Sequence, residues 1–179
     1  ILLSDEIYGE LNFEGKHLSI ATFYPEGTII SSGLSKWCGA GGWRLGTFTF
    51  PSSLDWLLEA MSSMASETFT STSAPIQYAA VSAFRGGIGI ERYLNNARSI
   101  LKSLGLSIHK KLDRVGISAT KPEGGFYLFC NFNKYASKLK KIGITNSSQL
   151  VQRLWEDTGV ALLPGSVFGR PENELTARL

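Results

Sequence analysis

The sequence has few cysteines, no long apolar run and no strong excess of one charge. Its two cysteines, Cys38 and Cys130, lack Cys-x-x-Cys spacing and lie in apolar or glycine-rich surroundings. This is typical of reduced thiols in a cytoplasmic protein and predicts neither a disulfide nor a metal site. No stretch approaches the roughly 18 uninterrupted apolar residues of a membrane span. The 18 Lys and Arg and the 15 Asp and Glu are scattered, which argues against a nucleic-acid-binding surface.

What is present is typical of a globular protein. The chain has 179 residues, of which 43% are hydrophobic, and it contains no collagen-like period or low-complexity tract. This is enough to build a buried core. The sequence lacks an initiator methionine and opens directly in the apolar residues 1–3, and residues 176–179 resemble the beginning of a strand. We therefore expect that it is part of a longer protein.

The first half is patterned like an α/β domain with a parallel sheet. Residues 1–4 predict a buried strand that delivers Asp5 and Tyr8 at its carboxyl end, where open α/β sheets bind their ligands. Residues 28–32 predict a second strand that also ends in polar residues and glycine. Residues 46–50 predict a third strand, closed by a proline.

Helices follow these strands. Ser52 or Ser53 can cap one helix. Ser73, which Pro75 follows in the first turn, can cap a second helix that stops near residues 86–87. A long apolar stripe from Ile90 to Ile108 then predicts a helix that bridges two domains. We place the domain boundary at about residue 88, so that residues 1–88 and 89–179 form separate domains.

The second half has an α+β pattern. Residues 125–132 and 160–163 predict strands, and Asn146 or Ser147 begins a helix that ends at Gly159. The sequence thus predicts a domain with a parallel sheet followed by a smaller α+β domain.

The segment richest in chemistry runs from residue 30 to residue 46. It leaves a predicted strand, passes the pair Ser35-Lys36, and ends on Arg44 after several glycines. Glycines let a backbone approach a ligand, arginine can hold a phosphate with two parallel hydrogen bonds, and a lysine in an apolar pocket can act as an amine nucleophile. The segment matches neither the P-loop pattern nor the dinucleotide-binding glycine pattern.

Four motifs in this order resemble those of the aspartate-aminotransferase-like, class I and II family of pyridoxal-phosphate enzymes. They are Asp-Glu-Ile-Tyr at 5–8, Ser-Lys at 35–36 with Gly-Trp-Arg-Leu-Gly at 42–46, Pro-Glu-Gly-Gly-Phe-Tyr at 122–127, and Pro-Gly with Phe-Gly at 164–169. The resemblance covers essentially the whole chain. It implies an α/β fold of fold type I, with part of the large parallel-sheet domain followed by the smaller domain.

The resemblance also implies a role for each matching residue. Lys36 would form the Schiff base with the aldehyde of pyridoxal 5'-phosphate and carry the proton of the substrate α-carbon. Asp5 would pair with the pyridinium nitrogen, and Tyr8 would hydrogen-bond the ring oxygen of the cofactor. An aspartate at the end of a buried strand needs such a partner, because an unpaired buried carboxylate is costly.

Further residues would hold the phosphate and the substrate. Arg44 would bind the phosphate as a planar fork, and Ser35 would add a hydroxyl. The family commonly has a hydroxyl residue where this chain has Gly33, so Ser32 and Ser35 both stay candidates. Arg178 resembles the arginine that clamps the substrate α-carboxylate.

These roles imply an aminotransferase that moves an amino group between an L-amino acid and a 2-oxo acid, acting as a homodimer. Two alternatives stay open at this point. One is other pyridoxal-phosphate chemistry on the same fold, such as β-elimination or decarboxylation. The other is a non-catalytic fragment, because the part of the family site that precedes Asp5 is not in this sequence. Dicarboxylic, aromatic and alanine-like substrates all remain open.

Overall fold

A computed structural model describes all 179 residues and divides the chain into two compact units. Unit 1 comprises Ile1–Ser99 and unit 2 comprises Ile100–Leu179. The division falls inside α3 (Ile88–Arg114), a helix of 27 residues that confirms the long helix expected from the apolar stripe. The assignment of residues 1–88 and 89–179 to a large and a small domain stays a prediction.

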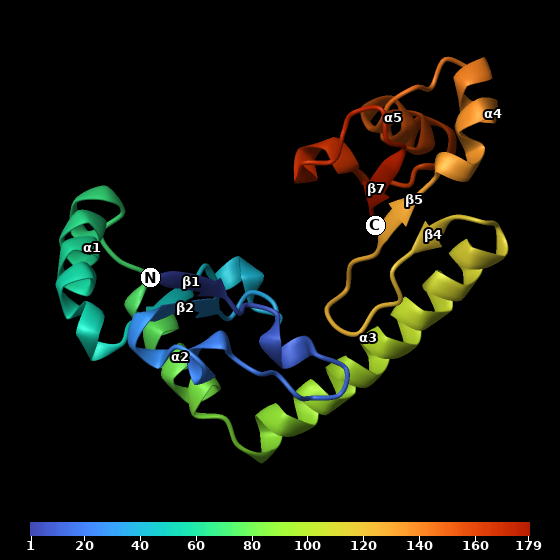
Figure 1. Cartoon of the computed structure of the whole chain (residues 1–179). Coiled ribbons are helices and arrows are strands. Elements are labelled where there is room, and N and C mark those ends of the chain that lie inside the picture. The colour runs from blue at the N-terminus through green and yellow to red at the C-terminus, as the bar shows by residue number, and fades with distance from the viewer. The chain divides into compact units, whose positions relative to one another are not determined.

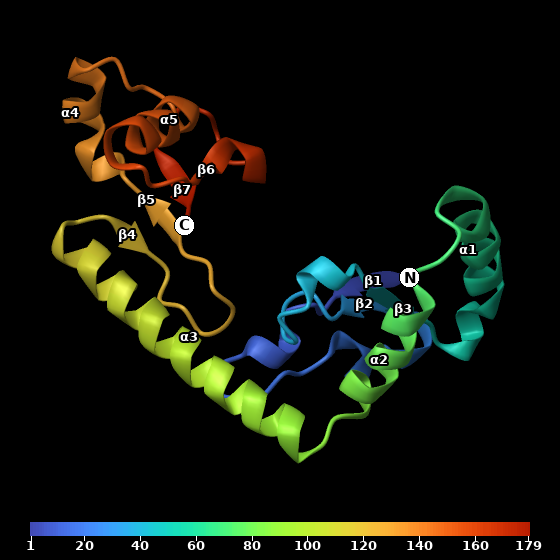
Figure 2. The same ribbon diagram turned by 180° about the vertical axis from the view of Figure 1, so that it is seen from behind.

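Unit 1 contains a three-stranded sheet in the order β1-β2-β3. β1 (Leu2–Asp5) and β2 (Thr28–Gly33) are parallel, as expected, so their carboxyl ends lie side by side at the C-terminal edge of the sheet, where both strands end. β3 (Gly46–Thr49) pairs with β2 in the antiparallel direction. Figure 2 shows these three strands side by side.

The expectation that β1 is buried is wrong for these 179 residues taken alone. Ile1 and Leu3 are 66% and 65% exposed, whereas Ile29 of the neighbouring β2 is 5% exposed. β1 lies at the edge of the sheet and has β2 as its one neighbouring strand. An apolar run predicts that a strand forms, but burial depends on what packs over the strand.

The helices of unit 1 begin close to the expected positions, but without the expected caps. α1 (Asp55–Thr68) follows a single turn of 3₁₀ helix, and Leu54 occupies its N-cap position. Ser53 does not cap the helix, because its hydroxyl donates to the carbonyl of Glu26. α2 (Ala74–Arg85) has Ser73 at its N-cap, as expected, although the side chain makes no capping hydrogen bond.

Unit 2 has a four-stranded antiparallel sheet in the order β4-β5-β7-β6, which agrees with the expected α+β pattern. The strands are β4 (Ser118–Ala119), β5 (Phe129–Asn131), β6 (Leu163–Pro164) and β7 (Thr176–Arg178). The strand predicted at 125–132 is therefore much shorter, because the chain turns first. Gly125 adopts φ 62°, a left-handed conformation that ends any extended run.

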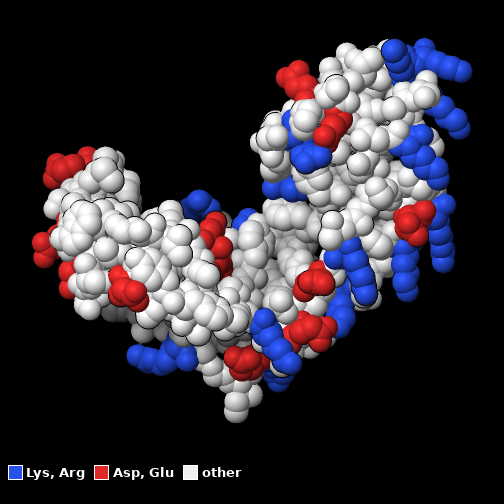
Figure 3. Space-filling model, viewed as in Figure 1, with Lys and Arg blue, Asp and Glu red and all other residues white.

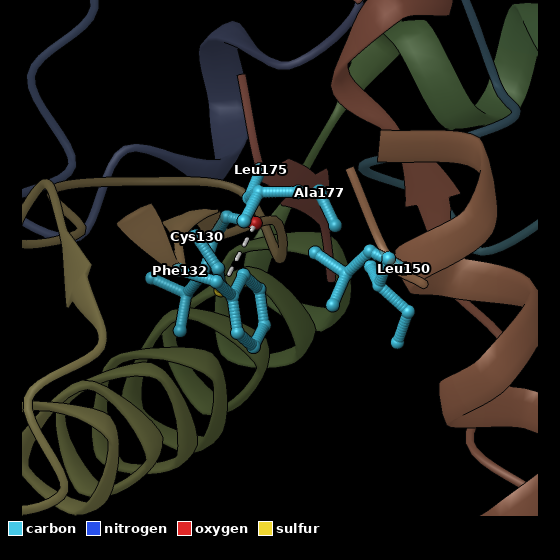
Figure 4. Close-up of a cluster of buried hydrophobic side chains, with 7 residues drawn as sticks. Cys130, Phe132, Leu150, Leu175 and Ala177 are labelled. Atoms are coloured by element: carbon cyan, nitrogen blue, oxygen red, sulfur yellow. Dashed lines mark hydrogen bonds between the residues drawn. The ribbon is translucent and has the colours of Figure 1, made fainter. Parts of the chain in front are cut away.

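The core of unit 2 is one cluster of seven buried residues, five of which are labelled in Figure 4. Cys130 of β5 and Ala177 of β7 are 1% and 0% exposed, and Leu150 of α5 (Ser147–Thr158) packs into the same cluster. Burial raises the pKa of the Cys130 thiol. Full burial of a side chain such as Leu150 stabilises the fold by about 1.5–3 kcal/mol.

The lysines of residues 138–141 lie on α4 (Ala136–Lys141) and are exposed to solvent. Figure 3 shows basic side chains gathered over α4 and the C-terminal part of α3. Figure 1 shows the elements of both units along the chain. None of the helices is both long enough and apolar enough to cross a membrane.

Candidate functional site

The carboxyl end of β1 passes directly into a tight turn at residues 5–9. The Ile7 amide donates to Asp5 Oδ1 at 3.3 Å, and the Gly9 amide donates to the Glu6 carbonyl at 2.9 Å. The Asp5 carboxylate is exposed, so the expectation that it ends a buried strand is wrong. It lies beyond the hydrophobic part of an edge strand, where a ligand can reach it.

The structure brings Lys36 and Tyr8 together. β2 ends at Gly33, and the loop that follows places the Lys36 Nζ atom 5.6 Å from the centre of the Tyr8 ring. This distance is in the range of a cation–π contact. The two parallel strands end at one edge of the sheet, and therefore the turn after β1 and the loop after β2 meet there. Asp5, Tyr8 and Lys36 thus all belong to this edge of unit 1.

The loop after β2 is closed by backbone contacts that need glycine. The Leu34 amide donates to the Leu45 carbonyl at 3.2 Å, and the Ala40 amide donates to the Leu34 carbonyl at 3.1 Å. A Cβ atom on Gly33 would lie 2.6 Å from the Leu45 carbonyl oxygen, closer than such atoms can approach. Gly33 is therefore a residue that this local backbone packing accommodates without a shift.

Arg44 has an unusual backbone conformation. Its φ of 57° and ψ of 50° are left-handed, which is uncommon for a residue other than glycine and costs about 1–2 kcal/mol. Its guanidinium donates to the Gly41 carbonyl at 2.7 Å, and a Cβ atom on Gly41 would lie 3.5 Å from the Ser35 carbonyl oxygen. Backbone strain of this kind is concentrated at functional sites.

Both serine candidates lie near Arg44. Ser32 and Arg44 line a cavity of about 950 Å³ in unit 1, together with apolar residues of α1. Ser35 is half-buried and lies next to Gly41, the residue to which Arg44 is hydrogen-bonded. Hydroxyls and a guanidinium are donors of the kind that suit a phosphate.

Arg178 belongs to unit 2, in β7, where its guanidinium lies close to two aromatic rings. Its Cζ atom is 4.3 Å from the centre of the Tyr127 ring and 4.4 Å from the centre of the Phe168 ring. Phe129 packs edge-on against Phe168, with the ring centres 6.0 Å apart. Both rings are within the range of a cation–π contact with the guanidinium.

Sequence reasoning missed the role of these rings. Residues 126–129 are expected to form a packed strand, yet Phe126 and Tyr127 lie outside β5 and are 45% and 38% exposed. The motif at 122–127 does carry a signal, because an exposed aromatic pair in a loop needs an explanation. Stacking on Arg178 supplies one for Tyr127.

Glu6 is a second feature that sequence reasoning missed. Its side chain is 10% exposed and accepts hydrogen bonds from Ser19 and Ser4, and it pairs with His17. Burial alone would raise the pKa of Glu6, but the hydrogen bonds from Ser19, His17 and Ser4 together with the charge of His17 hold this pKa below its ordinary value. The carboxylate is therefore the favoured form.

Known proteins resemble the chain over nearly its whole length. The sequence profile of the family "Aminotransferase class I and II" matches residues 1–176. An aspartate aminotransferase from Bacillus subtilis is 35% identical over 178 residues, which is 97% of this chain and 43% of the relative. An asparagine–oxo-acid transaminase from Streptococcus mutans has the same identity and the same coverage.

Solved structures of aminotransferases also resemble the chain. An aromatic aminotransferase from Pyrococcus horikoshii matches with a TM-score of 0.84 and 29% identity, over 100% of this chain and 45% of that one. An aspartate aminotransferase from Thermus thermophilus matches with a TM-score of 0.82. The expected α/β fold of fold type I is thereby confirmed, and the chain spans less than half the length of these relatives. The chain belongs to the aminotransferase class I and II family.

Proposed function

We propose that the protein transfers an amino group between an L-amino acid and a 2-oxo acid, using pyridoxal 5'-phosphate. The observation that carries this proposal is the approach of the Lys36 amine to the Tyr8 ring at the edge of the sheet where β1 and β2 end. Family membership supports the same reading. The proposal includes action as a homodimer in the cytoplasm.

The residues at this edge fit the chemistry of the cofactor. When bound, pyridoxal phosphate supplies an aldehyde that exchanges amines and a ring that withdraws electrons from the substrate. The exposed Asp5 carboxylate would hold a proton on the ring nitrogen, and the Tyr8 hydroxyl would donate to the ring oxygen. Lys36 Nζ would hold the cofactor at its aldehyde carbon, with loss of water. Once the substrate amine displaces it, the free lysine amine would take and return the proton of the substrate α-carbon.

The phosphate and the substrate carboxylate would each be held by an arginine guanidinium. Arg44, with Ser32 or Ser35, would bind the phosphate at the loop that follows β2. Arg178 would bind the α-carboxylate of the substrate through its guanidinium. Relatives named for aspartate, asparagine and aromatic amino acids share this fold, so the proposed substrate class is the L-α-amino acids.

The experiment compares the full-length protein with its Lys36→Ala variant, and uses Lys16→Ala as the matched control. Lys16 is an exposed lysine of unit 1 that is outside the site. With pyridoxal phosphate, we expect a visible absorbance band in the wild type and in Lys16→Ala that is absent from Lys36→Ala. Addition of an amino acid should then convert the band in the first two proteins.

Product analysis separates this reaction from other chemistry of the same cofactor. Turnover that requires a 2-oxo acid supports amino transfer, whereas release of ammonia or carbon dioxide without an oxo acid indicates elimination or decarboxylation. If wild type and Lys36→Ala give identical spectra, the assignment of Lys36 is wrong.

A further inference from the structure

A partly buried hydrogen-bond network lies beside the Asp5–Tyr8 turn, and the proposed chemistry does not use it. Glu6 Oε1 accepts from the Ser19 hydroxyl at 2.6 Å and from the Ser4 hydroxyl at 3.1 Å. Glu6 Oε2 lies 2.7 Å from His17 Nε2. Hydrogen bonds to a charged acceptor are the strong ones, and three of them converge here on one side chain that is 10% exposed.

The network and Asp5 are on opposite sides of the strand. Side chains alternate along an extended chain, so Ser4 and Glu6 share one side and Asp5 points to the other. The backbone amide of Glu6 also donates to the Ser31 carbonyl at 2.8 Å, which continues the contact with β2 by one residue. These contacts of Glu6 therefore restrain the backbone next to Asp5.

His17 contacts the other end of the turn, at Gly9. Its ring packs so closely on Gly9 that a Cβ atom there would lie 2.8 Å from His17 Cδ2. Gly9 in turn donates to the Glu6 carbonyl at 2.9 Å, so that His17 contacts both residues between which Tyr8 is held. By comparison, the Asp5 side chain itself accepts a single long hydrogen bond, from the Ile7 amide at 3.3 Å.

We propose that Glu6 and His17 are positioning residues that hold the Asp5–Tyr8 turn in the geometry required to contact the cofactor. This inference rests on the proposed function of Asp5 and Tyr8. Neither Glu6 nor His17 touches the reacting atoms. They act by keeping the carboxylate of Asp5 and the hydroxyl of Tyr8 in place before a ligand arrives, which lowers the ordering cost of binding.

The test uses the full-length protein with Glu6→Ala, Glu6→Gln and His17→Ala. The matched control is Glu10→Ala, because Glu10 lies in the same segment but is paired with Arg98 at 2.9 Å. The first readout is amide hydrogen exchange without cofactor. We expect Ile7 and Gly9 to exchange at least about tenfold faster in Glu6→Ala and His17→Ala, with Ile29 of β2 unchanged.

The second readout is the binding and spectrum of pyridoxal phosphate. We expect its dissociation constant to rise about tenfold in Glu6→Ala, and less in Glu6→Gln, which can still accept from the serines. The pH midpoint of the absorbance band should rise in Glu6→Ala, because a ring oxygen that loses its donor Tyr8 becomes more basic. Glu10→Ala should match the wild type in every measurement.

Each outcome decides the inference. It is overturned if Glu6→Ala unfolds at a lower temperature but keeps wild-type exchange at Ile7 and Gly9, or keeps wild-type cofactor affinity and band midpoint. If Glu6→Ala does not fold, the same criteria apply to Glu6→Gln. If the wild type does not bind pyridoxal phosphate, the proposed function fails, and hydrogen exchange alone decides whether the pair orders the turn.

Discussion

The two units of the chain differ in how they hold their candidate functional residues. In unit 2, Arg178 belongs to β7, and the preceding residue of this strand, Ala177, is fully buried in a core of seven residues. In unit 1, Asp5 and Tyr8 follow an exposed edge strand, and local hydrogen bonds hold their turn. Unit 2 is held mainly by packing, whereas the turn in unit 1 depends on polar contacts.

The two units also differ in net charge. Unit 1 has six basic and nine acidic residues and a net charge of −3, whereas unit 2 has twelve basic and six acidic residues and a net charge of +6. The net charge of +3 for the whole chain hides this asymmetry. It follows that overall composition says little about either unit, and that each should respond to substitution in its own way.

The largest expected effect tests the packing of unit 2 against the exposure of unit 1. Leu150→Ala should lower the free energy of unfolding by about 2–5 kcal/mol, because it opens a cavity in the core. The matched variant Leu3→Ala removes a side chain that is 65% exposed, and should change the free energy by less than about 0.5 kcal/mol. Denaturant unfolding of the 179-residue chain measures both.

Equal losses in these two variants would contradict the comparison. Such a result would mean that Leu3 is covered as well as Leu150 is in the folded protein. A small loss in Leu150→Ala would instead mean that the cluster around β5 and β7 rearranges to fill the space.

The next effect concerns the stacked guanidinium of unit 2. Arg178→Lys keeps the positive charge but loses the planar fork and the stacking on Tyr127 and Phe168. If one charged hydrogen bond worth about 1.5–3 kcal/mol is lost, kcat/KM for the amino acid should fall about tenfold to a hundredfold. Arg170→Lys is the control, because Arg170 pairs with Glu174 at the surface. Wild-type kinetics in Arg178→Lys would exclude a bidentate role.

Periodicity and terminal signals in the sequence predict the helices best. The apolar stripe of α3 and the limits of α5, between Asn146 and Gly159, agree with the structure because they depend on contacts within one helix. The parallel pairing of β1 and β2 is also predicted, although it joins distant segments, because both strands end in polar residues that are visible in the sequence.

Features that depend on distant contacts escape such reasoning. The exposure of β1 depends on what packs over it, and the stacking of Arg178 joins residues that are far apart in the chain. The Glu6–His17 pair crosses a loop with no periodic pattern that could predict it. The roles of Lys36, Asp5, Tyr8, Ser35, Arg44 and Arg178 stay predictions that the proposed variants test.

The smallest expected effect compares a helix start in each unit. Asn146 caps α5 in unit 2 by accepting from the Gln149 amide at 2.8 Å, and Gln149 Oε1 accepts from the Thr145 amide at 2.8 Å in return. Ser73 occupies the same position in α2 of unit 1 but makes no capping hydrogen bond. Asn146→Ala should therefore cost about 1 kcal/mol of stability, whereas Ser73→Ala should cost almost nothing. Both are measured by denaturant unfolding, and a loss of stability in Ser73→Ala equal to that in Asn146→Ala would show that Ser73 also caps its helix in solution.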